Sequence, residues 1–248
     1  MSTSYTSFFS STPTASSAGE MPKFWDSDHK ILYKADRSTI SYDVYSEIIC
    51  SRLAALLGLN HVSYTIVTID QKEYCKCENF ILRNEILITS ADLQKYSGFT
   101  QDKAITFIKD VNAMEFCQML LFDFLVVNTD RHHNNFGILK NTLTGKTRLT
   151  PLFDHNAALY SDRINDANEP FCNIDYWLTE RMYHNGIGKL PERVKQIDHE
   201  ARLNDYFKSL SYTDLADLFI DLPRLSDTRR LTLQNMLWSR YQYLEALL

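Results

Sequence analysis

The feature that most constrains this chain is a long apolar stretch that ends abruptly in a polar, charged cluster. Residues 113–127 (AMEFCQMLLFDFLVV) are apolar almost all round, which predicts a helix buried in a large core. The cluster NTDRHHNN, residues 128–135, follows directly. Because a buried helix is a rigid support, we expect its end to hold these polar groups at a cleft. The cluster could also be only a capped helix end and a solvated turn.

The spacing of the polar groups indicates which chemistry they could perform. Asp130 and Asn135 lie five positions apart, and Asp154 follows the apolar Leu149 to Phe153, which predicts a short strand that ends at Asp154. Oxygen ligands of this kind suit Mg²⁺, which binds a few protein oxygens together with phosphates and water. The same D-x-x-x-x-N spacing separates the catalytic Asp and the metal-binding Asn of protein kinases. This spacing alone is weak support.

The residues before this region supply the other parts that phosphoryl transfer requires. Residues 23–35 predict a β-hairpin with a longer loop, and Lys34 lies on its second strand. The apolar spacing of residues 42–57 predicts an amphipathic helix that carries Glu47, and Gly58 suits a left-handed helix end. A strand lysine followed by a helix glutamate repeats the order of the lysine and αC glutamate in kinases. Either residue alone would be read as an ordinary surface charge.

The order of elements predicts an α+β chain with a two-lobed, protein-kinase-like fold. Residues 61–69 and 73–82 predict a second antiparallel strand pair, so residues 1–100 form a β-rich N-lobe with one helix. Residues 101–248 form a mainly helical C-lobe, in which residues 213–221 and 228–247 have helical periodicity.

Charge and composition exclude several classes of protein. The net charge of −5 gives no support to nucleic acid as a direct partner. The longest apolar run is interrupted by Asp123 and is too short to cross a bilayer, and no signal peptide is recognisable, so we expect a cytoplasmic protein without a transmembrane segment. The five cysteines lack zinc-site spacing and are expected to be reduced structural thiols.

With these motifs in view, the chain resembles the HipA-like serine/threonine kinases, a bacterial family. The resemblance rests on SSAGEMPKFW, ILYKAD, SEIICSRLAALLGL, NTDRHHNNFGIL and LTPLFD, which occur in the family's order up to Asp154. The DRHxxN loop is also similar to that of the phosphoinositide kinases, which are distant relatives. The C-terminal helices match only in general character.

The resemblance implies a role for each matching residue. Asp130 would be the catalytic Asp, with His132 ordering its loop, and Asn135 and Asp154 would bind Mg²⁺. Lys34 would bind the phosphates of ATP and be held by Glu47. Glu78, Asn79 and Phe80 would form the adenine-contacting linker between the lobes. The segment Ser16, Ser17, Ala18 and Gly19, which composition alone assigns to a disordered tail, would be the phosphate-binding loop.

The resemblance also implies regulation and partners. Some family members autophosphorylate a serine in this loop, and Ser16 and Ser17 are the candidates here. Larger toxin members carry an additional N-terminal subdomain, which a separate protein could supply here. An antitoxin is another expected partner of a toxin, and compact relatives include secreted effectors. The expected substrate is a protein Ser/Thr hydroxyl.

Three alternatives stay open. A lipid kinase could use the same site on a phosphoinositide headgroup, although the basic cluster expected near a membrane is missing. A nucleotide-binding scaffold without catalysis is disfavoured because Lys34, Glu47, Asp130, Asn135 and Asp154 are all present. A zinc or dinuclear hydrolase would need more converging ligands than His133 and His155 offer.

Overall fold

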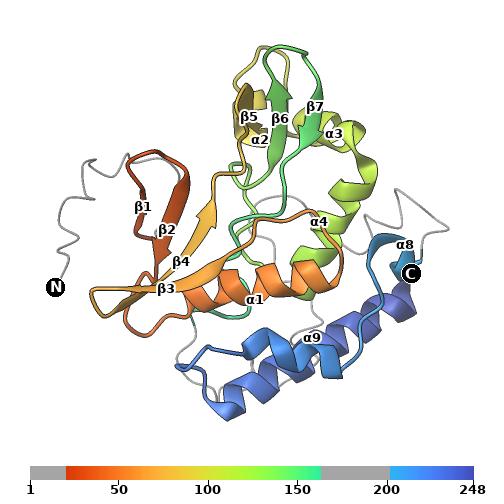
Figure 1. Cartoon of the computed structure of the whole chain (residues 1–248). Coiled ribbons are helices and arrows are strands. Elements are labelled where there is room, and N and C mark those ends of the chain that lie inside the picture. Colours follow the sequence, from red (N-terminus) through yellow and green to blue (C-terminus); the bar gives the residue numbers. More distant parts are fainter. Residues whose placement is uncertain (1–20, 163–201) are drawn as a thin grey trace.

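The computed structural model describes residues 21–162 and 202–248 (Figure 1). The predicted phosphate-binding loop, residues 16–19, and Cys172 lie outside the described residues. In chain order, the elements are β1 (Lys23–Trp25), β2 (Ile31–Ala35), α1 (Asp43–Leu56), β3 (Thr65–Ile69), β4 (Lys72–Glu78), β5 (Glu85–Thr89), α2 (Ser90–Leu93), α3 (Gln101–Val111), α4 (Ala113–Leu125), β6 (Gly137–Asn141), β7 (Thr147–Leu149), α8 (Leu203–Tyr206), the 3₁₀ helix η2 (Thr213–Phe219) and α9 (Asp227–Leu247).

The N-terminal part is an antiparallel sheet with strand order β1-β2-β4-β3, against which α1 packs (Figure 1). Both predicted strand pairs are present, and Lys34 lies on β2 opposite Cys75 of β4. Since side chains alternate across a strand, Lys34 and Cys75 point to the same face of the sheet. Both are buried. This face is the one that α1 and the cleft described below share.

Helix α1 begins and ends close to the predicted positions. Its end is a Schellman motif, in which Leu59 N donates to Ala54 O and Gly58 N donates to Ala55 O. Gly58 has φ +74°, a conformation that glycine adopts at no steric cost. Eleven of the fourteen residues of α1 are buried, so the helix is enclosed by the sheet on one side and by C-terminal elements on the other.

A second, smaller sheet has the order β5-β6-β7 and joins segments that are far apart in the sequence. Strand β5 precedes α2, α3 and α4, whereas β6 and β7 follow the polar cluster at residues 128–135. The polar cluster is therefore anchored at both ends, by α4 before it and by β6 after it. The lobe boundary at residue 100 stays a prediction.

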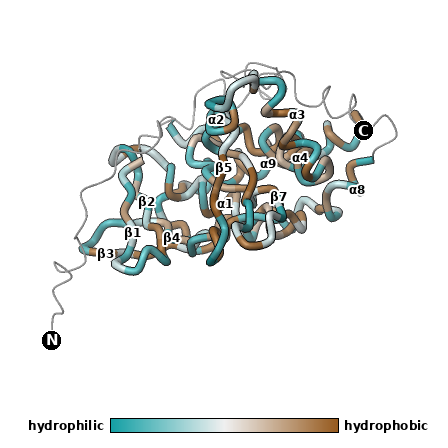
Figure 2. Tube along the Cα trace, turned by 90° about the horizontal axis from the view of Figure 1, so that it is seen from above, coloured by the Kyte–Doolittle hydropathy of each residue, from teal (hydrophilic) through white to brown (hydrophobic). Residues whose placement is uncertain are grey.

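Helix α4 is the buried helix that the apolar stretch predicts. Asn112 caps its start by accepting from Glu115 N, and nine residues between Phe116 and Leu125 are buried. Hydrophobic stretches of the chain run through the middle of the molecule around α1 and α4 (Figure 2). Helix α9 packs beside α4, where Arg240 Nε donates to Phe124 O over 2.7 Å.

Two predicted elements differ from the structure. The strand expected at 149–153 is wrong in extent: β7 ends at Leu149, and Asp154 lies on a loop. Pro151 cannot donate to a ladder, and Leu152 instead forms an isolated bridge with His61, after α1. The predicted helix at 213–221 is the 3₁₀ helix η2, which ends at Phe219.

Two findings concern membrane spans and cysteines. No helix in the described ranges is long and apolar enough to span a bilayer. The four cysteines within these ranges, Cys50, Cys75, Cys77 and Cys117, are free and buried, as the prediction of structural thiols requires.

Gly137 is the first residue of β6, and replacing it tests how closely β6, which anchors the polar cluster, approaches β5. A Cβ atom at Gly137 would lie 2.3 Å from Ile88 O and 2.7 Å from Thr89 Cα, both backbone atoms of β5 that cannot move independently. We therefore expect Gly137→Ala to lower the free energy of unfolding by about 1–3 kcal/mol in a denaturant titration. Lys140→Ala, at an exposed position of the same strand, is the control and should change it by less than about 0.5 kcal/mol. Equal stability of the two variants would contradict the close approach of β5 and β6.

Candidate functional site

A cleft of about 400 Å³ opens beside the N-terminal sheet, where the chain leaves β4 and where the loops after α4 and β7 converge. Ligand pockets commonly measure roughly 300–1,000 Å³, so a nucleotide-sized ligand is a reasonable occupant. Part of the wall is apolar, and the rest carries charged and amide side chains. The lining includes Lys23, Trp25, Leu32, Lys34, Tyr64, Glu78, Asn79, Phe80, Leu87, Asn135, Phe153 and Asp154.

Lys34 is the cation at the centre of this cleft. Its Nζ lies 2.5 Å from Glu47 Oε1 and 2.8 Å from Asp154 Oδ1, and only 4% of the residue is exposed. Burial alone would lower the pKa of Lys34, but the Asp154 and Glu47 carboxylates raise it well above its usual value. Lys34 therefore remains charged, and it meets two carboxylates that lie 13 and 120 positions further along the sequence.

Glu47 links the two halves of the site. One carboxylate oxygen contacts Lys34, while Oε2 accepts from His155 N over 2.9 Å. Burial raises the pKa of Glu47, and the attraction of Lys34 opposes that rise. Ser46, the preceding residue on α1, donates to His155 O over 2.6 Å. Helix α1 is thus bonded directly to the segment that carries Asp154.

Asp154 sits in the left-handed region with φ +62°, which Asp tolerates better than most residues. Burial would raise the pKa of its carboxyl, but the charge and hydrogen bond of Lys34 lower it to about 2. The group is therefore ionised at neutral pH. Lys34 occupies Oδ1, so Oδ2 is the oxygen that can face a ligand in the cleft.

Asp130 follows the end of α4, where the backbone is strained. A complete Schellman motif is formed there, but its left-handed position is occupied by Val127 (φ +56°) instead of the usual glycine. Asn128 then donates to Asp123 Oδ1 over 2.8 Å and accepts from Asp130 N over 3.1 Å. A β-branched residue in this region is an outlier, and such strain often occurs at functional sites.

The carboxyl group of Asp130 is partly open to solvent, with 33% of its side chain exposed. Burial raises its pKa, and the negative charge of Asp154 raises it further, while His132, Arg131 and Arg37 act in the opposite direction. A carboxylate with a raised pKa is a better proton acceptor than an ordinary Asp. The geometry therefore suits a group that positions and deprotonates a hydroxyl.

His132 lies beside Asp130 with Nε2 3.9 Å from Asp130 Oδ2. Its Nδ1 accepts from Asn134 N over 3.3 Å, so in the neutral ring the proton is on Nε2 and faces Asp130. Nε2 is buried and makes no hydrogen bond to the described residues. His133 instead contacts Ser90 Oγ over 2.8 Å, away from the reacting groups, which favours a structural role for His133.

Asn135 adds a further oxygen group beside Asp130, which, like His132, does not itself line the cleft. Its Nδ2 donates to Asp130 O over 3.0 Å, and this contact leaves its Oδ1 for another partner. Asn135 and Asp154 both line the cleft. Within the described residues, no three His, Cys, Asp or Glu side chains gather as a metal site. A cation here would have two protein oxygens and otherwise phosphates or water, which is the arrangement that Mg²⁺ prefers.

The linker residues also line the cleft. Glu78 ends β4, and Phe80 stacks at a tilt on Phe153 with ring centroids 5.2 Å apart. Asn79 N donates to Lys30 O over 2.7 Å, and Asn79 Oδ1 accepts from Ile81 N over 3.0 Å. The linker is therefore held in one conformation next to apolar side chains that could pack on a planar base.

Arg131, which the sequence prediction missed, holds the polar loops together. It donates twice to Asp123, over 2.8 and 2.9 Å, and also to Asn135 O and Phe153 O. Arginine has donors only, so His155 Nε2, 2.9 Å from Arg131 Nη2, must accept. Burial and Arg131 lower the pKa of His155 well below its usual value, so this histidine is neutral. The signal for this network was Asp123, an acid inside an otherwise apolar helix.

A second missed residue is Lys23. It pairs with Lys34 in the register of β1 and β2, lines the cleft and contributes to the low pKa of Asp154. The alternation of side chains along the predicted hairpin could have indicated it.

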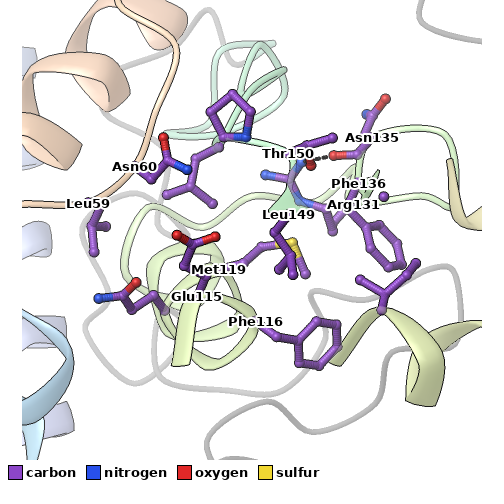
Figure 3. Close-up of a pocket in the computed structure, with 15 residues that line it drawn as sticks. Leu59, Asn60, Glu115, Phe116, Met119, Arg131, Asn135, Phe136, Leu149 and Thr150 are labelled. Carbon is purple, nitrogen blue, oxygen red and sulfur yellow. Dashed lines mark hydrogen bonds between the residues drawn. The ribbon is translucent and has the colours of Figure 1, made fainter. Parts of the chain in front are cut away.

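Behind the loop, Arg131 and Asn135 also border a small cavity of about 20 Å³, room for about one water molecule, together with Glu115 and Asn60 (Figure 3).

Comparisons with known proteins agree with this arrangement. A family model described as HipA-like kinase matches residues 26–172, more than half of the chain. The serine/threonine-protein kinase CtkA of Helicobacter pylori is 24% identical over 201 residues, which cover 73% of this chain and 58% of that protein. This chain thus spans little more than half the length of that relative.

One solved structure shows the same fold. The crystal structure of a Helicobacter pylori proinflammatory kinase, CtkA, superposes with a TM-score of 0.70 at 17% identity, over 92% of each chain. A complex of HipA, HipB and operator DNA from Shewanella oneidensis MR-1 aligns at a TM-score of only 0.46, with 17% identity over 97% of this chain and 59% of that chain, and supports no argument. The predicted kinase-like fold is confirmed, and the chain belongs to the HipA-like kinase family.

Proposed function

We propose that this chain is an ATP- and Mg²⁺-dependent protein kinase that transfers the γ-phosphate of ATP to a serine or threonine hydroxyl. The observation that carries the proposal is the contact of Lys34 with both Glu47 and Asp154 in a cleft that Asn135 also lines. The lysine–glutamate pair and the metal-binding Asp must both be in place for a kinase to act. The curated relative that is 24% identical is called a serine/threonine-protein kinase, which supports this acceptor.

Each group has a place in the proposed reaction. Lys34 binds the non-transferred phosphates, and the linker residues 78–80 contact the base. Asn135 and Asp154 would hold Mg²⁺, which would neutralise phosphate charge. Asp130 accepts the hydroxyl proton of the protein substrate as the oxygen attacks the γ-phosphorus, and ADP leaves. His132 donates from Nε2 to Asp130 or to a phosphate oxygen.

Lys23 extends this proposal. It stands beside Lys34 on the neighbouring strand and lines the same cleft, so it supplies a second positive charge near the phosphates. Two cations on adjacent strands suit a triphosphate better than one.

Regulation, partners and location are proposed on the family resemblance alone. Residues 16–19 would cover the phosphates, and autophosphorylation of Ser16 or Ser17 would place a competing phosphate there. An antitoxin, or a separate protein that corresponds to the N-terminal subdomain of larger members, would be the partner of a cytoplasmic toxin kinase. A secreted effector would need neither, and the genes beside this one distinguish the two roles.

The catalytic assignment predicts the effect of replacing Asp130. Asp130→Asn keeps the size of the side chain but removes the proton acceptor, so we expect kcat for phosphate transfer to fall by about 10²–10⁴-fold. The measurement is incorporation of labelled γ-phosphate into the chain itself or into a protein acceptor. Asp110→Asn, on the exposed side of α3, should retain wild-type activity. Undiminished transfer by Asp130→Asn would refute the assignment, and transfer to lipid vesicles but to no protein would favour the lipid kinase alternative.

The metal assignment predicts a change in the Mg²⁺ requirement. Excess chelator should abolish transfer, and added Mg²⁺ should restore it. Asn135→Ala removes one of two proposed oxygen ligands, so a higher Mg²⁺ concentration should be needed for half-maximal activity. Asn204→Ala, on α8 and exposed, should leave the requirement unchanged. An unaltered Mg²⁺ dependence in Asn135→Ala would mean that Asn135 is not a ligand.

A further inference from the structure

Arg224 lies between η2 and α9, and it contacts three elements of the N-terminal part at once. Its Nη2 lies 2.5 Å from Asp36 Oδ2, just after β2. Its Nε lies 2.8 Å from Glu73 Oε2 on β4, an ion pair in which neither atom makes a hydrogen bond to the described residues. Its guanidinium also covers the ring of Tyr45 on α1, with the central carbon 4.5 Å from the ring centroid. The C-terminal segment is thus joined to both strands and the helix that surround Lys34.

Asp36, which Arg224 contacts, is connected both to the strand of Lys34 and to the helix of Glu47. Asp36 follows Lys34 by two residues, so its position sets the end of the strand that carries Lys34. The other carboxylate oxygen of Asp36 accepts from Val44 N over 2.7 Å, at the first turn of α1. Val44 and Glu47 are three residues apart, which places them on neighbouring turns of one helix face. One carboxylate held by Arg224 therefore aligns the strand of Lys34 with the helix of Glu47.

Arg224 also connects α1 with β4, through Tyr45 and Glu73. Arg224 N donates to Tyr45 Oη over 3.3 Å, and Tyr45 Oη lies 3.1 Å from Glu73 Oε1. Strand β4 and helix α1 are therefore tied to the same arginine. Arg229, one turn into α9, stacks on Tyr42 at 4.2 Å and donates to Tyr160 O over 2.9 Å. The start of α1 is held from the C-terminal side at several points.

Stability alone does not account for this convergence. The side chain of Arg224 is 32% exposed, and screening by solvent reduces what a partly exposed ion pair contributes to the free energy of folding. Arg224 does not line the nucleotide-sized cleft, so it does not contact a ligand bound there. It borders a separate hollow of about 740 Å³, together with Asp36 and Glu73. What its contacts do determine is the position of β2 relative to α1. Kinases that regulate the lysine–glutamate pair do so through the position of this helix.

We infer that Arg224 is a positioning residue, which holds α1 against β2 so that Lys34 and Glu47 stay paired. The inference rests on the proposed kinase function for its effect on turnover, but not for its effect on Lys34 itself. The segment from η2 to α9, which carries Arg224 and shows no catalytic motif, then acts as a fixed support for α1, the helix that carries Glu47.

The first test compares Arg224→Ala with Arg230→Ala. Arg230 lies in the same segment, but its guanidinium donates only to the carbonyl oxygens of Phe219, Leu222 and Leu225, so it anchors the segment without touching α1 or β2. At saturating Mg-ATP we expect Arg224→Ala to lose about 10–100-fold in kcat, the size of effect that a small displacement of catalytic groups causes. Its KM for ATP should change less. Arg230→Ala should lose stability in a denaturant titration but keep the kcat of its folded fraction.

Asp36→Asn, alone and combined with Arg224→Ala, tests whether Arg224 affects kcat through Asp36. The amide oxygen that this substitution introduces could still accept from Val44 N, but the charge that binds Arg224 is lost. Asp36→Asn should therefore lower kcat in the same direction but by less than Arg224→Ala, which also loses the contacts with Glu73 and Tyr45. The double variant should have the kcat of Arg224→Ala, since Asp36 acts through Arg224. Arg224→Lys should restore only part of kcat because one ammonium group cannot serve two carboxylates in fork geometry. Wild-type kcat in Arg224→Ala, or an equal loss in Arg230→Ala, would overturn the inference.

A second readout needs no kinase activity. The full-length chain is treated with an amine-reactive ester, and modification of Lys34 is followed by peptide mass spectrometry. Lys34 is buried and paired in the wild type, so it should react slowly, whereas Arg224→Ala should increase its labelling severalfold and Arg230→Ala should not. If the wild type transferred no phosphate but Lys34 still became reactive in Arg224→Ala, the proposed function would fail and the positioning role would stand. Unchanged protection of Lys34 in Arg224→Ala would overturn the positioning role.

Discussion

The contact of the Lys34 ammonium group with two carboxylates is the interaction on which the rest of this structure depends. Lys34 and Glu47 are buried, whereas 22% of the Asp154 side chain is exposed. Removing one partner of a buried ion pair typically costs about 3–5 kcal/mol, because the remaining charge is left without compensation. Lys34, Glu47 and Asp154 come from a strand, a helix and a loop, so their pairing requires all three elements to be in place. The buried charges thus contribute to the specificity of the arrangement more than to its stability.

The polar loops beside this cluster are organised by the same rule, that buried polar groups need partners. Arg131 supplies donors to Asp123, to His155 and to two backbone carbonyls, so the loop after α4 and the loop that carries Asp154 are bonded to the same side chain. The left-handed Val127 and Asp154 show that the backbone is strained at both loops. Strain of this kind persists where the surrounding contacts determine the conformation, and the Arg131 network provides those contacts.

Arginines play a similar part on the C-terminal side. Arg52 on α1 donates to a carbonyl oxygen of η2, Arg240 on α9 donates to the end of α4, and Arg224 and Arg229 hold the start of α1. These bonds attach the C-terminal elements to the two helices, α1 and α4, that carry Glu47 and lead to Asp130. The C-terminal third therefore supports the geometry of the site without lining the cleft, in the part of the chain that the structure describes.

The sequence by itself determined the local elements. Hydrophobic periodicity placed α1 and α4 and alternation placed the two strand pairs, because these signals depend on near neighbours in the chain. The types and order of Lys34, Glu47, Asp130, Asn135 and Asp154 predicted a phosphate site, and this assignment stays a prediction. The tertiary structure alone decided that β5 pairs with β6, that Leu152 bridges to His61 instead of extending β7, and that Arg131 and Arg224 organise the site. Arg131 and Arg224 act through partners up to 188 positions away, and an arginine with distant partners looks in the sequence like any solvated charge.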